Sequence, residues 1–179
     1  EARLEALMQT ILEQNVTCSY VVLDLCNEAR IQDLVTTINI MEQPLDLLIQ
    51  GAGSIKVDSF EDMSYADIES QFRVNMLAPM QLTKMLLPSL KVQRGQIVFL
   101  NSSAGLRARA HIVGYAASKA ALGAFAEGLR AELNPLGVSH FGFLVVGQSP
   151  PLEKEPSVNL LTAIVDAIRK RTRKRHVTD

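Results

Sequence analysis

The sequence contains little cysteine, no tryptophan and no long apolar run. Its only cysteines, Cys18 and Cys26, flank one predicted strand, which argues against a disulfide framework and favours reduced thiols in a cytoplasmic protein. Charged or polar residues interrupt every apolar stretch before it reaches the ~20 residues that cross a bilayer. We therefore expect neither a disulfide-rich domain nor a membrane span.

Neither sign of charge dominates the chain, which carries 18 Lys and Arg against 19 Asp and Glu for a net charge of -1. With 47% hydrophobic residues, its 179 residues are enough to bury a sizeable core in one globular domain. The basic stretch Arg169–His176 fits either an anionic-surface module or a solvated helix end. Because the whole chain is nearly neutral, we favour the solvated helix end and expect no nucleic-acid partner. Separately, we expect no metal site.

Helical and strand patterns alternate along the chain, which is typical of a parallel sheet covered by helices. Residues 4–12 and 31–40 have helical periodicity, and so do 65–90, with an interruption near Asn75, and 115–133. The apolar runs at 20–24, 45–50, 96–100 and 141–146 predict buried strands. A further helix is expected over 159–168, and a strand begins at 177.

Tyr115 and Lys119 stand four residues apart at the start of an apolar helical stretch, so they share one helix face. The ammonium can lie near the phenol and favour its ionised form. Ser102, at the end of the preceding strand, could hold a substrate oxygen beside that phenol. The adjoining Ser103 is the alternative, and the spacing to Tyr115 favours Ser102. A tyrosine and a lysine at this spacing are by themselves more often packing and a solvated charge.

The order of further motifs narrows the interpretation. The chain resembles the short-chain dehydrogenase/reductase family from about residue 3 to residue 147 through Asp24-Leu25, Gly51-Ala52-Gly53, Asn75, Ser102, Tyr115 and Lys119. The resemblance implies a single Rossmann-type domain over 1–179, a doubly wound parallel α/β sheet with helices on both faces. It also implies an oxidoreductase that uses NAD or NADP to interconvert a small-molecule carbonyl and an alcohol.

The resemblance assigns four catalytic roles. Tyr115 would exchange a proton with the substrate oxygen, and Lys119 would favour the phenolate and reach the nicotinamide ribose. Ser102 would hydrogen-bond the reacting oxygen where charge develops. Asn75, an unfavourable residue inside a helix, would hold a water against the lysine.

The same resemblance implies the cofactor contacts. Asp24 would bind the adenine amino group and Leu25 would pack beside the ring, although Asp24 could instead cap the helix that begins near Asn27. Gln50 and Gly51 stand where the family has two asparagines, whereas Ala52 and Gly53 keep its pattern. Gly53 would let the backbone approach the ribose, and Gly147 would lie near the nicotinamide.

The family's first strand, glycine-rich turn and second strand have no counterpart in the sequence. In this fold that turn holds the cofactor's pyrophosphate at a helix N-terminus. We expect that the sequence lacks an N-terminal part, with further residues omitted after about 149. The alternative is a catalytically impaired homologue that acts as a binding or assembly partner.

Two surface questions stay open at this level. In the family, the helices carrying Asn75 and Tyr115 commonly pack across a two-fold axis, so a homodimer or homotetramer is expected. Phe125, Leu129 and Leu133 would serve that interface or face the sheet. His111, on the loop before Tyr115, is either a substrate contact or a plain surface residue.

Overall fold

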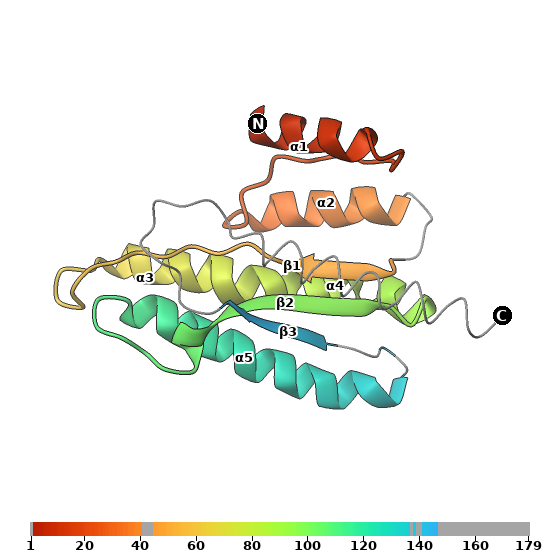
Figure 1. Cartoon of the computed structure of the whole chain (residues 1–179). Coiled ribbons are helices and arrows are strands. Elements are labelled where there is room, and N and C mark those ends of the chain that lie inside the picture. The colour runs from red at the N-terminus through yellow and green to blue at the C-terminus, as the bar shows by residue number, and fades with distance from the viewer. Residues whose placement is uncertain (1, 41–44, 137, 139–140, 147–179) are drawn as a thin grey trace. The chain divides into compact units, whose positions relative to one another are not determined.

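The computed structural model describes residues 2–40, 45–136, 138 and 141–146, with no side-chain detail for the last range (Figure 1). The chain divides into two compact units, Glu1–Gln43 and Pro44–Asp179, each described by itself. Gly147, the basic stretch and the elements predicted beyond residue 146 lie outside the described residues. The single-domain organisation stays a prediction.

The first unit contains two helices, α1 (Ala2–Leu12) and α2 (Glu28–Ile40). Both coincide with predicted helical segments. The start of α2 is capped by Asn27, whose Oδ1 accepts a hydrogen bond from the Arg30 N–H at 3.2 Å.

The strand predicted over 20–24 is wrong. Residues 16–24 form no strand, and Val21 and Val22 keep about half of their surface exposed, at 53% and 54%. A run of β-branched residues satisfies its backbone only when a neighbouring strand pairs with it. None of the three described strands, β1 to β3, pairs with this segment. The apolar pattern was correct for a strand, but pairing decides whether one forms.

The second unit is built on a parallel sheet of three strands in the order β1-β2-β3. These are β1 (Leu47–Gln50), β2 (Gln96–Ser102) and β3 (Phe141–Val146). Leu48 is paired with Ile97, and Ile97 with Phe141. Since all three strands run the same way, their carboxyl ends share one edge of the sheet, the usual ligand-binding edge of such folds.

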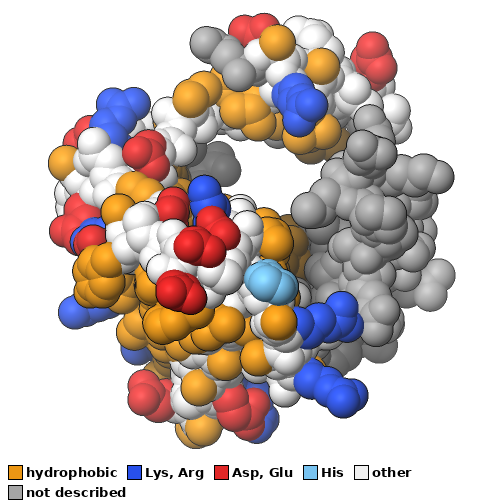
Figure 2. Space-filling model, turned by 90° about the vertical axis from the view of Figure 1, so that its left-hand side faces the viewer, with side chains coloured by type: hydrophobic (Ala, Val, Ile, Leu, Met, Phe, Trp, Pro, Cys, Tyr) orange, Lys and Arg blue, Asp and Glu red, His pale blue; other side chains and the backbone are white. Residues whose placement is uncertain are grey.

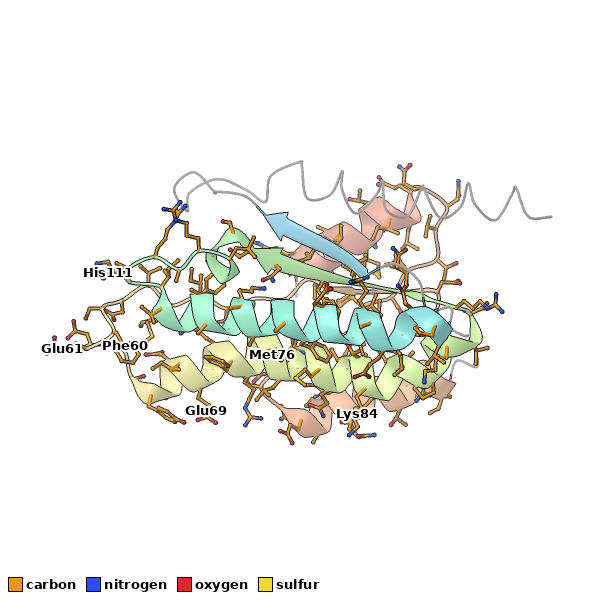
Figure 3. All side chains as sticks on the ribbon, turned by 90° about the horizontal axis from the view of Figure 1, so that it is seen from below. Phe60, Glu61, Glu69, Met76, Lys84 and His111 are labelled. Atoms are coloured by element: carbon orange, nitrogen blue, oxygen red, sulfur yellow. The ribbon has the colours of Figure 1, made fainter. Side chains whose placement is uncertain are left out.

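Helices α3 (Tyr65–Phe72), α4 (Ala78–Val92) and α5 (Val113–Leu133) accompany this sheet, and a short 3₁₀ turn (Asn134–Leu136) follows α5. Figures 1 and 3 show α4 and α5 side by side along the sheet. The Phe125 ring packs edge-on against Phe99 of β2, with centroids 5.8 Å apart, and Leu133 is buried. These two residues therefore take the sheet-facing alternative rather than an exposed interface.

The predicted interruption near Asn75 is confirmed as a π-helical turn, η1 (Arg73–Leu77), between α3 and α4. The Ala78 N–H donates to the Arg73 carbonyl five residues back instead of four. Pro79 has no N–H for the Asn75 carbonyl, so the regular helical bond at that position is lost. Such turns are frequent at functional sites.

Helices long and apolar enough to cross a bilayer do not occur in the parts of the chain that the structure describes.

Candidate active site

Asn75 is the centre of the polar network at the carboxyl edge of the sheet. Its side chain is fully buried inside η1. Its Oδ1 accepts the Ser54 N–H at 2.8 Å, and its Nδ2 donates to the Ser54 carbonyl at 2.8 Å. The Asn75 amide thus binds both the N–H and the carbonyl of Ser54, as a residue on a neighbouring strand would.

A second bond joins Asn75 to the helix that carries the catalytic candidates. Nδ2 also donates to the Ser118 hydroxyl at 2.9 Å, and that hydroxyl donates to the Tyr115 carbonyl at 2.8 Å. Both N–H groups of the Asn75 amide are therefore used by protein acceptors.

Lys119 lies almost completely buried, with 4% of its surface exposed. Its ammonium donates to the Leu100 carbonyl of β2 at 2.9 Å and lies 6.0 Å from the centroid of the Tyr115 ring. Desolvation by burial lowers the pKa of the Lys119 ammonium. Across the described residues no carboxylate pairs with it, so this cation is held by a neutral acceptor next to a phenol.

Ser102 and Tyr115 keep their hydroxyl protons available. The Ser102 Oγ accepts the Ala104 N–H at 3.2 Å and donates to no acceptor within the described ranges. The Tyr115 hydroxyl is likewise free of hydrogen-bond partners there, and both side chains are half-buried. Two donors without internal partners at one edge of a sheet can both serve an oxygen atom of a ligand.

Gly105 fixes the distance between the Ser102 turn and α5. A Cβ on Gly105 would come within 2.8 Å of the Lys119 carbonyl carbon and 2.9 Å of the Ala120 nitrogen. Only glycine allows the short 3₁₀ turn (Ser103–Gly105) to touch the helix backbone there. Ser102 is thereby held beside the first turns of α5.

The segment after β1 brings the predicted cofactor glycines to the same place. Gly51, Ala52 and Gly53 are exposed. A Cβ on Gly53 would lie 3.6 Å from Asn75 Oδ1 and 3.8 Å from Lys119 Nζ, so the backbone of Gly53 lies against the two functional side chains. The preceding Gln50 donates to the Pro79 carbonyl at 3.1 Å and to the Thr83 hydroxyl at 3.2 Å, which fastens the end of β1 to α4.

The predicted adenine contacts belong to the first unit. Asp24 is exposed, and its Oδ1 accepts the N–H of Cys26 at 2.9 Å. Leu25 is half-buried. Because Asn27 is the residue that caps α2, the capping alternative for Asp24 is wrong. The Asp24 carboxylate accepts this one hydrogen bond, which lies in an exposed turn.

A cavity of about 350 Å³ adjoins the site and runs along α5. Its walls include Asn101, Gly105 and Lys119 at one end and Glu127 and Arg130 at the other.

Comparison with known proteins decides which family this geometry belongs to. The family model described as short chain dehydrogenase matches residues 1–144. The chain belongs to the short-chain dehydrogenase family. The predicted α/β fold of Rossmann type is confirmed by this match and by the structures below.

Two relatives of this chain have names that differ in the substrate they state. Ketoacyl reductase HetN of Nostoc sp. is 38% identical over 117 residues, which cover 65% of this chain and 41% of that protein. Human retinol dehydrogenase 8 is 33% identical over 131 residues, which cover 73% of this chain and 40% of its own. The chain thus spans about two-fifths of the length of these relatives.

Solved short-chain dehydrogenases have the same fold. An alcohol dehydrogenase from Thermococcus sibiricus, complexed with 5-hydroxy-NADP, superposes with a TM-score of 0.75 at 24% identity over 82% of this chain and 61% of its own. A 4-hydroxyisoleucine dehydrogenase complexed with NADH and succinate gives 0.70 at 25% identity over 84% of this chain and 70% of its own.

The structure adds two residues that sequence reasoning missed. Ser118 links Asn75 to α5, and the signal was a serine inside the otherwise apolar stretch before Lys119. Gln71 is buried four residues before Asn75, where a polar side chain on the same helix face was the available signal.

Proposed function

We propose that this chain is the catalytic part of an NAD- or NADP-dependent oxidoreductase that interconverts a carbonyl and a secondary alcohol. The observation that carries the proposal is the arrangement around α5. Within the described residues, the hydroxyls of Ser102 and Tyr115 have no hydrogen-bond acceptor, the turn after Ser102 packs on α5 at Lys119, and no carboxylate neutralises the buried lysine.

Tyr115 donates a proton to the carbonyl oxygen in reduction and removes one from the hydroxyl in oxidation. Lys119, whose ammonium lies 6.0 Å from the centroid of the phenol ring, places a positive charge beside the proton-transferring residue. The Ser102 hydroxyl donates a hydrogen bond to the same substrate oxygen as negative charge develops there. Asn75 takes part in holding a water that resupplies the proton.

The residues present fit the nicotinamide half of the cofactor. Gly53 has no side chain to separate the ribose from Asn75 and Lys119, whose atoms lie within 4 Å of where a Cβ would stand. Gly51 and Ala52 continue the exposed segment, and we assign Asp24, Leu25 and Gly147 as further contacts of the bound dinucleotide. When bound, the nicotinamide supplies the hydride that reaches the substrate carbon.

The test is substitution of Tyr115 by phenylalanine in the full chain, with the rate of carbonyl-dependent NADH or NADPH oxidation as the readout. Removing the acid should lower kcat at least ~100-fold, while cofactor affinity stays within a factor of about two. Tyr65→Phe is the matched control, because Tyr65 is 80% exposed at the start of α3. A Tyr115→Phe variant that keeps the parent rate contradicts the assignment.

The second candidate is an impaired homologue that acts as a binding or assembly partner. One observation favours it: Gln50, which stands where the family has an asparagine, uses its side-chain amide on the Pro79 carbonyl and the Thr83 hydroxyl of α4. Titration with NADH and NADPH, followed by cofactor fluorescence, separates the two. Binding of either supports the oxidoreductase, and binding of neither supports the impaired form. A cytoplasmic homodimer or homotetramer is part of the leading proposal.

A further inference from the structure

The segment that follows the cofactor glycines is held at alternate residues. The Ser54 N–H donates to Asn75 Oδ1 at 2.8 Å, the Lys56 N–H to Gln71 Oε1 at 3.2 Å, and the Asp58 N–H to the His111 carbonyl at 2.9 Å. Binding every second N–H is the pattern of an extended chain paired along one edge. Here the partners are side-chain amides and a loop carbonyl instead of a strand.

The helix supplies these amides at a matching distance. Four residues of helix, from Gln71 to Asn75, advance by roughly 6 Å, and two residues of extended chain, from Ser54 to Lys56, by roughly 6.6 Å. Amides spaced four apart on one helix face can therefore bind N–H groups spaced two apart on an extended segment.

Gln71 is built for this task rather than for filling the core. It is 1% exposed, and its Nε2 donates to the Asp67 carbonyl at 3.2 Å while its Oε1 takes the Lys56 N–H. Leucine or methionine would fill the space without needing partners. Its amide also packs against the start of α5, since a Cβ on Gly114 would lie 3.1 Å from Gln71 Nε2. Tyr115 is the next residue.

The alternation leaves two apolar side chains together on one side of the segment. With Ser54, Lys56 and Asp58 bound through the backbone, Ile55 and Val57 lie on one side of the segment and remain 45% and 53% exposed. The far end of the segment meets the loop of His111, which lies near Phe60 at one end of α5 in Figure 3. Hydrophobic side chains also lie near the exposed histidine in Figure 2.

We propose that Gln71 is a positioning residue that holds Ser54–Asp58 extended, so that Ile55 and Val57 form an apolar wall of the substrate site. The substrate class this selects is a carbonyl compound with an extended apolar substituent. The proposal rests on the proposed function, because it places that wall beside the acid Tyr115.

The kinetic test compares Gln71→Leu with its parent on 2-butanone and 2-decanone in the presence of the reduced cofactor. Loss of the wall should lower kcat/KM about tenfold for 2-decanone and less than about twofold for 2-butanone, with an unchanged pH profile of kcat. Gln96→Leu is the matched control, since Gln96 is a buried glutamine at the opposite end of β2 from Ser102. Equal losses on both ketones, or no loss on either, overturn the proposal.

Two further measurements separate the possible failures. If Gln71→Leu does not fold, Ile55→Ser and Val57→Ser alter the wall at exposed positions, and each must reduce activity on 2-decanone selectively.

Amide hydrogen exchange tests the positioning without turnover: in Gln71→Leu the Lys56 N–H should exchange at least ~10-fold faster, whereas the Ser54 N–H keeps its protection. Unchanged exchange at Lys56 overturns the positioning role. If the unsubstituted chain is inactive on both ketones, the proposed substrate class is wrong. The rate of hydrogen exchange at the Lys56 N–H still decides whether Gln71 positions the segment.

Discussion

The predicted site falls into two regions that the chain builds in opposite ways. Around Asn75, Ser118 and Lys119, side chains exposed by 4% or less are joined by hydrogen bonds between elements far apart in sequence. Around Asp24, the carboxylate is exposed and holds one bond within its own turn. The first region depends on tertiary packing for the bonds that join its elements, so substitutions there should cost stability and activity together. The second should tolerate change.

The largest effect is expected where the 3₁₀ turn Ser103–Gly105 touches α5. Gly105→Ala forces a Cβ to within 2.8 Å of helix backbone, so chain segments must move apart, and we expect a loss of about 2–3 kcal/mol in the free energy of unfolding. Gly128→Ala is the control, because a Cβ there meets nothing within 4 Å in the interior of α5. That variant should gain about 0.5–1 kcal/mol. Urea unfolding of both variants checks the contrast, and equal effects would refute the packing argument.

A smaller loss is expected for Ser118→Ala. The substitution leaves one buried N–H of Asn75 without an acceptor, which costs about 1–2 kcal/mol. Since Asn75 then loses one of its anchors, kcat should fall while cofactor affinity holds. Ser89→Ala, which removes a part-buried acceptor of the Leu45 N–H away from the site, supplies the comparison. The idea fails if Ser89→Ala and Ser118→Ala have the same effect on kcat.

The pH dependence of stability tests the burial of Lys119. Its pKa is lowered in the fold by desolvation, so the unfolded chain binds more protons between that lowered value and the ordinary lysine value. Lys119 therefore makes the free energy of unfolding rise with pH across that window. Lys119→Met should remove this contribution and show a flatter profile from neutral to alkaline pH. Parallel profiles for the two proteins would show that the lysine is not desolvated.

The smallest effect belongs to Asp24→Ala. The variant loses one exposed bond to the Cys26 N–H, so the free energy of unfolding should change by less than about 0.5 kcal/mol. Cofactor titration of the same variant tests the adenine contact that the family resemblance implies. Weaker NADH and NADPH binding with unchanged stability would support that contact, and unchanged binding would remove it.

Sequence patterns predicted most of the elements and failed where pairing was needed. The interruption at Asn75 was visible because an asparagine and a nearby proline disfavour regular helix locally. The apolar run at 20–24 has the same local signature as β1. Of these two segments, β1 forms a strand because it pairs with β2, and residues 20–24 form none. Local preference is encoded residue by residue, whereas a strand exists only through its neighbour.

The sequence by itself determined the chemistry available: a tyrosine and a lysine on one helix face, a serine at a strand end and glycines where backbone must approach closely. Tertiary structure decided which of these groups are engaged. Packing across the fold binds the Asn75 amide to Ser54 and Ser118 and the Lys119 ammonium to the Leu100 carbonyl. Among the residues that the structure describes, it gives the Ser102 and Tyr115 hydroxyls no acceptor. The reason is physical, because burial obliges each polar group to find a partner, and that partner is set by packing across the fold.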